Sequence, residues 1–171
     1  GSWSQIGQDI DGEAAGDNSG QSVSLSNNGS IIAIGEFRHN FGAGHVRIFE
    51  NISGLWTQIG LNIDAEGSND RFGNSLSLSS DGSIVAIGAY GNDGNGQNTG
   101  HVRIYENVGG SWSQIGLDID GESAGDHFGC SVSISDNGNI VAIGAYANNG
   151  NAYRSGHVRI YENVGGSWSQ I

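Results

Sequence analysis

The sequence predicts an all-β fold built from repeated four-stranded units, and three observations support this. The phrase Trp-[Ser/Thr]-Gln-Ile occurs four times, at separations of 53, 56 and 56 residues, and Gly-His-Val-Arg-Ile occurs three times, at separations of 56. Residues 56–111 and 112–167 are identical at 37 of 56 positions, so the units share one structural role. Within each unit, apolar and polar residues alternate with a period of two, which is typical of β-strands.

We expect four antiparallel strands in each unit, named A to D in chain order. Strand A, as in CSVSIS (130–135), alternates apolar residues with serine, whereas strand B, as in NIVAIGAY (139–146), is continuously apolar, like a strand covered on both faces. Strand C reads GHVRIYEN (100–107) and strand D reads SWSQIGLDI (111–119). An Asn-Gly or Asp-Gly pair between A and B favours a two-residue hairpin turn. No segment combines a helical period with helix caps.

Such repeats are typical of β-propeller blades, which bury both sheet faces by stacking. The predicted units are residues 1–10, an outer strand D of a preceding or partner blade, then blade 1 (11–63), blade 2 (64–119) and blade 3 (120–171), whose strand D is truncated. Closed propellers have about four to eight blades. Three blades would therefore close only by oligomerisation or with further blades. We expect self-association through unpaired edges, as a head-to-tail oligomer, a filament or part of a longer array.

Composition excludes several classes of function. The chain has six arginines, no lysine and a formal net charge of −12. This charge repels phosphate backbones and anionic membranes, and no apolar run approaches the roughly 20 residues of a membrane span, so we expect neither nucleic-acid binding nor membrane insertion. Catalysis has little support, because the paired carboxylates recur symmetrically, no G-x-S-x-G elbow precedes a helix, and Cys130 has no evident activator.

Acidic residues recur in the link from strand D to the next strand A. Their oxygens fall at relative positions 1, 3, 5 and 9, a spacing similar to that of calcium loops, which makes Ca²⁺ the one candidate cofactor. The alternative is a solvated turn in which aspartates cap backbone amides, since the glycine and final glutamate of an EF-hand-type loop are missing. The candidate metal ligands are Asp9, Asp11, Glu13, Asp17, Asp64, Glu66, Asp70, Asp118, Asp120, Glu122 and Asp126.

The loops between strands B and C offer a candidate ligand-binding face. Because neighbouring strands alternate in direction, these loops share one end of each blade with the acidic links. A glycan or a protein is the expected ligand class, and an ordinary exposed loop is the alternative. The candidate residues are Asp93, Asn95, Asn98, Asn148, Asn149 and Asn151.

Other recurring residues indicate structural roles. Arg47, Arg103 and Arg159 occupy one position of strand C, and each is expected to pair with a carboxylate of the Asp-Ile-Asp segment. Trp56 and Trp112 are expected to pack against the blade body. The three histidines that begin strand C are expected to form structural hydrogen bonds, because blades would hold them too far apart for a shared metal.

The units resemble the FG-GAP repeat of integrin α-chain propellers, and more closely its relatives in bacterial and algal surface proteins. The resemblance rests on Phe72-Gly73 with Gly88-Ala89-Tyr90, and on the same pair of motifs at Phe128-Gly129 and 144–146. The first unit departs from it, with Ser19-Gly20 and Gly35-Glu36-Phe37. The resemblance implies a propeller acting outside the cell in adhesion and recognition. The calcium loop of integrins does not carry over, because its place holds only the Asn/Asp-Gly turn.

Overall fold

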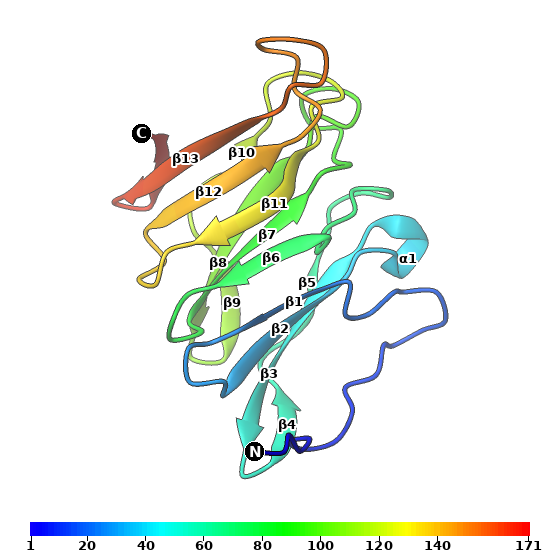
Figure 1. The fold of residues 1–171 in the computed structure, drawn as a ribbon, viewed down its shortest axis with the longest axis vertical. Helices are drawn as coiled ribbons and strands as arrows, with labels where there is room; N and C mark the ends of the chain where they lie inside the picture. The colour runs from blue at the N-terminus through cyan, green and yellow to red at the C-terminus, as the bar shows by residue number, and fades with distance from the viewer.

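The computed structural model describes residues 1–171 and consists of three antiparallel sheets stacked face to face, one above another in Figure 1. The sheets do not close into a ring. Blade 1 contains β1 (Ser22–Leu25), β2 (Ile31–Glu36), β3 (His45–Ile52), β4 (Leu55–Gln58) and β5 (Ile63–Asp64). Blade 2 contains β6 (Ser75–Leu78), β7 (Ile84–Ala89), β8 (His101–Val108), β9 (Ser111–Gln114) and β10 (Ile119–Asp120). Blade 3 contains β11 (Phe128–Ile134), β12 (Ile140–Ala145), β13 (His157–Val164) and β14 (Ser167–Gln170).

These sheets confirm the predicted all-β fold of propeller blades with four strand positions each. The one helical element is α1 (His39–Gly42), a single turn in the B–C loop of blade 1, and Asn40 and Phe41 within it have positive φ angles. No helix is long and apolar enough to cross a membrane.

The outer strand D is divided into two pieces, so the prediction of one continuous strand is wrong. In blade 2, β9 pairs with the second half of β8 and β10 with its first half. The chain leaves the ladder at a glycine, Gly116, with φ +72°. A side chain here, or at the equivalent Gly60, would collide with the carbonyl group of a glycine in the following blade. The break in strand D therefore marks a close approach between neighbouring blades.

The A–B turns are also longer than the predicted two-residue hairpins. In blade 2, β6 ends at Leu78 and β7 begins at Ile84, and Gly82 alone has a positive φ angle. The side chain of Asp81 accepts hydrogen bonds from the amide of Ser83 and from Ser79 Oγ. An aspartate that hydrogen-bonds the amide two residues on favours this turn, in which only the glycine is left-handed.

Two hydrophobic clusters join the three blades. Strand β7 contributes to both, because Val85 and Ile87 face blade 1 whereas Ala86 faces blade 3, and all three are fully buried. The phenylalanines of the Phe-Gly pairs are also buried, Phe72 between blades 1 and 2 and Phe128 between blades 2 and 3. Burying a large apolar side chain stabilises the fold by about 1.5–3 kcal/mol, so the blade interfaces form the core of the molecule.

Hydrogen bonds repeat across the two interfaces. The hydroxyl group of Ser22 donates to the carbonyl of Gly73 over 2.6 Å, and that of Ser75 donates to the carbonyl of Gly129 over 2.7 Å. On the outer rim, the indole N–H group of each of three tryptophans donates over 3.0 Å to an isoleucine carbonyl of the preceding repeat. These pairs are Trp56 with Ile6, Trp112 with Ile59, and Trp168 with Ile115.

Residues 1–21 form no strand and run along blade 1 (Figure 1). The segment 1–10, predicted as an outer strand of another blade, has no strand C of a preceding blade to pair with, and a strand needs such a partner to form its ladder. Its pairing with another blade therefore stays a prediction. Trp3 within it is fully exposed, unlike the other three tryptophans.

Replacing Phe128 by alanine should lower the free energy of unfolding by about 3–5 kcal/mol, because the change leaves a cavity in a blade interface. Urea denaturation followed by tryptophan fluorescence measures this. The control is Phe41→Ala, since Phe41 is 88% exposed and its loss should change stability by less than about 0.5 kcal/mol. Equal stability of the two variants would show that the blade interface does not carry the core.

Candidate functional site

The D–A and B–C loops meet at one end of each blade, where a buried aspartate organises both. Asp70 Oδ2 accepts hydrogen bonds from the amide of Gly67 over 2.9 Å and from the side-chain amide of Asn92 over 3.2 Å. In blade 3, Asp126 accepts the same two bonds from Ser123 and Asn148. This geometry matches the turn in which aspartate caps backbone amides.

The arginines of strand C all pair with carboxylates, but only Arg103 pairs with the predicted Asp-Ile-Asp segment, because Arg47 pairs with Glu36 of β2 and Arg159 with Glu122. Arg103 donates through Nε and Nη2 to the two oxygens of Asp118 over 3.0 and 2.9 Å, and it also pairs with Glu66. Burial raises the pKa of Asp118, but the hydrogen bonds from Arg103 and Gln114 and the positive charge of Arg103 together outweigh burial, so the net pKa lies below its usual range. Arg159 pairs with Glu122 and lowers the pKa of that carboxyl. Several predicted calcium ligands are thus engaged by arginine.

The remaining predicted site residues fall into two groups. A polar hollow of about 380 Å³ in blade 3 is lined by Asn148 and Asn149 together with Glu122 and Asp126. Glu13 and Asp64 both approach His45 in blade 1, at 3.8 and 3.7 Å, whereas the others do not meet in this hollow. Asp93 accepts a hydrogen bond from the amide of Asn98 within its own loop. The predicted site residues that are exposed to solvent are Asp9, Asp11, Asp64, Asn95, Asp120 and Asn151.

Blade 1 departs from this pattern at four positions. Ser19 stands where the other blades have Phe72 and Phe128, and Glu36 where they have alanine. His39 replaces the asparagine that bonds to the buried aspartate, and Asn62 replaces the aspartate that pairs with arginine. Ser19 Oγ donates to Glu36 Oε1 over 3.0 Å, so a polar pair occupies the position of the missing phenylalanine.

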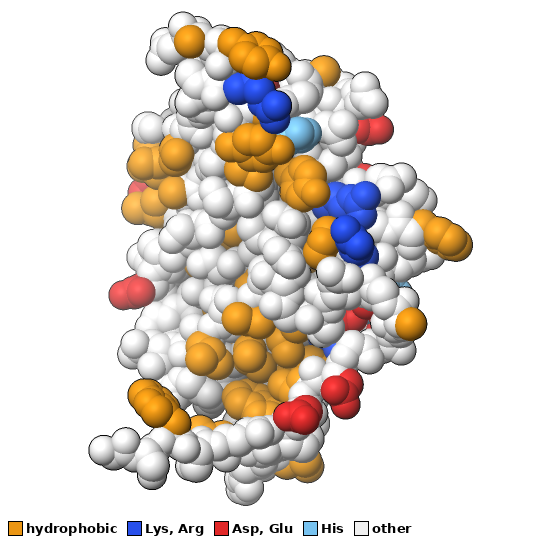
Figure 2. Space-filling view, turned by 45° about the vertical axis from the view of Figure 1, so that its right-hand side comes forward, with side chains coloured by type: hydrophobic (Ala, Val, Ile, Leu, Met, Phe, Trp, Pro, Cys, Tyr) orange, Lys and Arg blue, Asp and Glu red, His pale blue; other side chains and the backbone are white.

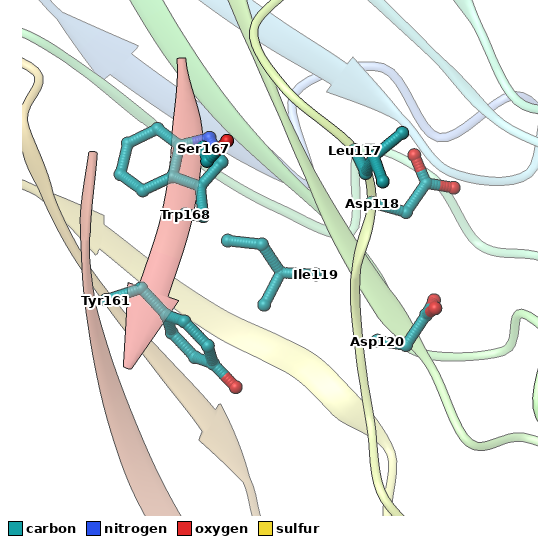
Figure 3. A pocket seen from close by; sticks show the side chains of 7 residues that line it. All are labelled: Leu117, Asp118, Ile119, Asp120, Tyr161, Ser167 and Trp168. Atoms are coloured by element: carbon teal, nitrogen blue, oxygen red, sulfur yellow. The ribbon is translucent and has the colours of Figure 1, made fainter. Parts of the chain in front are cut away.

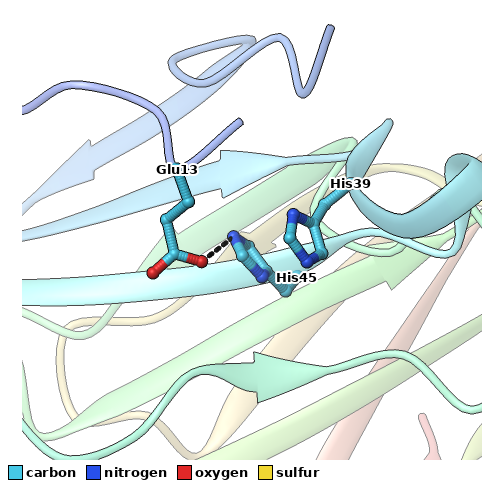
Figure 4. A group of neighbouring side chains, drawn as sticks. All are labelled: Glu13, His39 and His45. Carbon is cyan, nitrogen blue, oxygen red and sulfur yellow. Dashed lines mark ion pairs between the residues drawn. The ribbon is translucent and has the colours of Figure 1, made fainter. Parts of the chain in front are cut away.

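These departures create a group that we call the blade 1 cluster, formed by Glu13, Asp17, Glu36, His39 and His45. Its members come from the acidic link, the B–C loop and the ends of β2 and β3, and Figure 4 shows three of them. The imidazole rings of His39 and His45 stack with centroids 4.0 Å apart. Asp17 Oδ2 lies 3.0 Å from Nδ1 of His39, and Oε2 of Glu36 lies 3.0 Å from Nε2 of His45.

Two carboxylates of the blade 1 cluster, Glu36 and Asp17, have pKa values below the usual range. Burial raises the pKa of Glu36. The hydrogen bonds from Arg47 and the attraction of its guanidinium oppose this effect, and the net pKa lies below the usual range. Burial likewise raises the pKa of Asp17, and hydrogen bonds from His39 and from the amide of Ala14 lower it below its usual range. The cluster is therefore an anionic site, part of it buried.

The outer rim carries a second kind of feature, a groove between the strand D segments of neighbouring blades. In Figure 3, Trp168 and Tyr161 of blade 3 lie across from Asp118, Ile119 and Asp120 of blade 2. The groove has a volume of about 310 Å³, and an equivalent groove of about 320 Å³ lies between blades 1 and 2, lined by Trp112 and Tyr105.

The stacked four-stranded blades and the repeated loop end define a propeller-type recognition module. The family model described as the FG-GAP repeat matches residues 64–105 and 118–161, which make up half of the chain. The chain therefore belongs to the FG-GAP repeat family, which confirms the resemblance seen in the sequence. Blade 1, where the departures lie, falls almost entirely outside the matched ranges.

Among solved structures, the chain is similar to Sqt1 of Saccharomyces cerevisiae, which has a WD40 β-propeller-like fold. The TM-score is 0.57 at 15% identity, and the match covers 90% of this chain and 35% of Sqt1. At this identity the likeness shows the fold alone, and the chain spans about a third of the length of Sqt1. No curated protein matches the sequence.

Sequence reasoning did not find the blade 1 cluster. Considered one at a time, Ser19 and Glu36 are only departures from the Phe-Gly and Gly-Ala-Tyr motifs. The signal was available, because four replaced positions of one repeat map onto a single place of the blade. Comparing the repeats position by position would have shown Phe→Ser, Ala→Glu, Asn→His and Asp→Asn together.

We expect Asp118→Asn to lower the free energy of unfolding at pH 7 by about 1–3 kcal/mol, because Arg103 loses one of its two carboxylate partners. The pKa of Asp118 is below its ordinary value of 3.8 in the folded state, so its contribution is present at neutral pH and is lost as the pH falls below about 5. The difference between variant and wild type should therefore shrink between pH 7 and pH 3.

Urea denaturation at a series of pH values measures this difference. Asp136→Asn is the matched control, since Asp136 is exposed and has no ion pair. A difference that stays constant down to pH 3 would show that the Arg103–Asp118 pair does not contribute to folding stability.

Proposed function

We propose that this chain is a non-catalytic recognition module that acts outside the cell or at its surface and associates head to tail through the outward faces of blades 1 and 3. FG-GAP repeats are typical of extracellular or surface proteins and of non-catalytic modules, which supports both parts of the proposal. The observation that carries the association is that both outward faces keep exposed apolar side chains at strand positions that are buried between blades inside the molecule, although blade 1 has Ser19 and Glu36 in place of Phe72 and Ala89.

The outward face of blade 1 repeats the face by which blade 2 packs on blade 1. Leu76 and Leu78 of blade 2 are 8% and 7% exposed there, whereas their equivalents Val23 and Leu25 are 58% and 57% exposed. Figure 2 shows hydrophobic side chains uncovered over the lower part of the molecule, where blade 1 lies, and again over the upper part. An uncovered apolar face of this kind favours association.

The outward face of blade 3 complements it. Val102 and Ile104 of blade 2 are 0% and 1% exposed against blade 3, whereas their equivalents Val158 and Ile160 are 67% and 42% exposed. Blade 3 of one copy therefore offers blade 1 of the next the same apolar surface that blade 2 offers blade 3. Repeating one contact in this way gives a heterologous, head-to-tail assembly.

Two hydrogen-bonding sites extend the match. Inside the chain Ser75 donates to the carbonyl of Gly129, and the equivalent pair across the proposed contact is Ser131 of one copy with Gly20 of the next. In addition, β14 pairs only with Tyr161–Val164 of β13, so the first half of β13 lacks an outer partner. Ile10, the equivalent of Ile119 in β10, would supply that partner from the next copy.

Light scattering of the 171-residue chain should give a mass of at least twice 17.7 kDa at tens of micromolar. Val158→Asp should dissociate the assembly, because it places a charge on an apolar interface. The control is Leu117→Asp, on the outer rim, where Leu117 is 87% exposed. A wild-type mass of 17.7 kDa at all concentrations, with a folded far-ultraviolet spectrum, would contradict the proposal.

Glycan binding is a second candidate function, favoured by the two equivalent grooves of the outer rim. Each combines a tryptophan and a tyrosine with two polar side chains of a strand D segment, and a small number of fixed polar groups beside aromatic surface is the usual composition of a ligand site. A repeated groove also provides several weak sites on one particle, which raises avidity.

A glycan array probed with the labelled chain tests this second function. We expect Asp120→Asn to reduce binding severalfold, because Asp120 lines the groove of Figure 3 and would accept hydrogen bonds from sugar hydroxyl groups. Asp136→Asn, away from the groove, should leave binding unchanged. Binding that is equal for both variants, or no binding to any glycan, would exclude the groove as a sugar site.

A further inference from the structure

We infer that the blade 1 cluster is a binding site for a divalent transition-metal ion such as Zn²⁺, held by His39, His45 and Glu13, with Glu36 as an adjoining ligand. The site does not depend on the proposed association or on glycan binding. It combines Glu13 and His45, which recur in every blade, with His39 and Glu36, by which blade 1 differs from the other blades.

Atoms suitable as metal ligands lie close together in the blade 1 cluster. The ligand atoms of Glu13, His39 and His45 all lie within 4.8 Å of one another, and so do those of Asp17, Glu36 and His39. Nε2 of His45 lies 3.0 Å from Oε2 of Glu36 and 3.8 Å from Oε2 of Glu13 (Figure 4). Ligands about 2.0–2.2 Å from a tetrahedral zinc ion lie a little over 3 Å from each other, so metal binding would draw these side chains together and turn the stacked rings of His39 and His45 until their nitrogen lone pairs converge.

Two of these ligand atoms are buried and lack hydrogen bonds of good geometry. His45 and Glu36 are both fully buried, and Nε2 of His45 and Oε2 of Glu36 lie 3.0 Å apart as an ion-pair contact without good hydrogen-bond geometry; Nε2 of the equivalent His101 in blade 2 likewise lacks a hydrogen bond. A buried polar atom without a partner costs about 1–3 kcal/mol, and more when it is charged. Both atoms belong to the group around His39, and a metal ion bound there would satisfy them.

The negative charge of the blade 1 cluster also favours a bound cation. Glu13, Asp17 and Glu36 bring three carboxylates to the cluster, and Arg47 is the one guanidinium that pairs with any of them. With neutral histidines the cluster carries an excess of two negative charges, and a divalent cation would neutralise it. In blade 2 Arg103 pairs with both Glu66 and Asp118, whereas in blade 1 Glu13 has no guanidinium partner.

The donor set selects the class of metal. Two imidazole nitrogens with one or two carboxylate oxygens suit zinc and its neighbours in the first transition row, whereas Ca²⁺ and Mg²⁺ prefer oxygen ligands alone. The Glu13 side chain is 41% exposed and provides a path for entry from solvent. Asn62 donates to Glu13 Oε2 over 3.1 Å and so helps to orient that ligand.

The repeats provide variants that should keep the fold. His39→Asn installs the residue of the other blades, where Asn92 and Asn148 make the same bond to the buried aspartate. Glu13→Gln removes a partly exposed ligand, and Glu66→Gln, at the equivalent position of blade 2, is its matched control. Unfolding temperatures without metal establish which of the variants fold.

The experiment is a calorimetric titration of untagged, chelator-treated protein with zinc chloride alone at pH 7.5. We expect one zinc ion per chain for the wild type and for Glu66→Gln, and an affinity at least about tenfold lower for His39→Asn and Glu13→Gln. Zinc should raise the unfolding temperature of the wild type and leave that of His39→Asn unchanged.

Two results would overturn the inference. One is the absence of zinc binding by the wild type at zinc concentrations up to about 1 mM. The other is equal zinc affinity of the wild type and a folded His39→Asn variant, which would place any bound zinc elsewhere. The same titration with calcium chloride should give equal heats for the wild type and for His39→Asn. A calcium-binding heat that is present in the wild type and lost in His39→Asn would contradict the assignment of the metal class.

Discussion

Stacking of the sheets is the constraint on which the rest of the structure depends. Each middle strand carries apolar side chains on both faces, so a blade cannot bury its own core and must have a neighbour on each side. Ala86 and Ile87 are adjacent in sequence, fully buried, and belong to different interfaces. The serine and tryptophan hydrogen bonds, the glycines of the outer rim and the divided strand D all follow from the close approach that stacking requires.

The same constraint explains why much of the fold could be predicted. A period of two, a repeat of 56 residues and a continuously apolar strand B together describe a sheet covered on both faces, and the three blades have that form. The details that the sequence did not predict depend on the neighbouring blade. Strand D breaks at Gly116 because of a carbonyl group in blade 3, and a local pattern contains no information on that contact.

The candidate site was less predictable for a related reason. The spacing around Asp70 and Asp126 is similar to that of calcium loops and predicts metal ligands, yet in the structure these residues hold two loops together. Their equivalent Asp17 lies beside His39 instead of an asparagine, and this single exchange changes the surroundings of the same carboxylate. Repetition in the sequence identified the framework, whereas the distinctive chemistry lies at the positions where one repeat differs from the others.

The pairing of arginines has a further consequence for proteolysis. The chain contains no lysine, so its six arginines are the only positions after which a trypsin-like protease cleaves. Half of them lie in the central strands β3, β8 and β13, in ion pairs and in paired backbone. The other three, Arg38, Arg71 and Arg154, lie in the D–A and B–C loops. A protein secreted among such proteases would therefore be cut first in loops at one end of its blades, while the sheets and their interfaces stay intact.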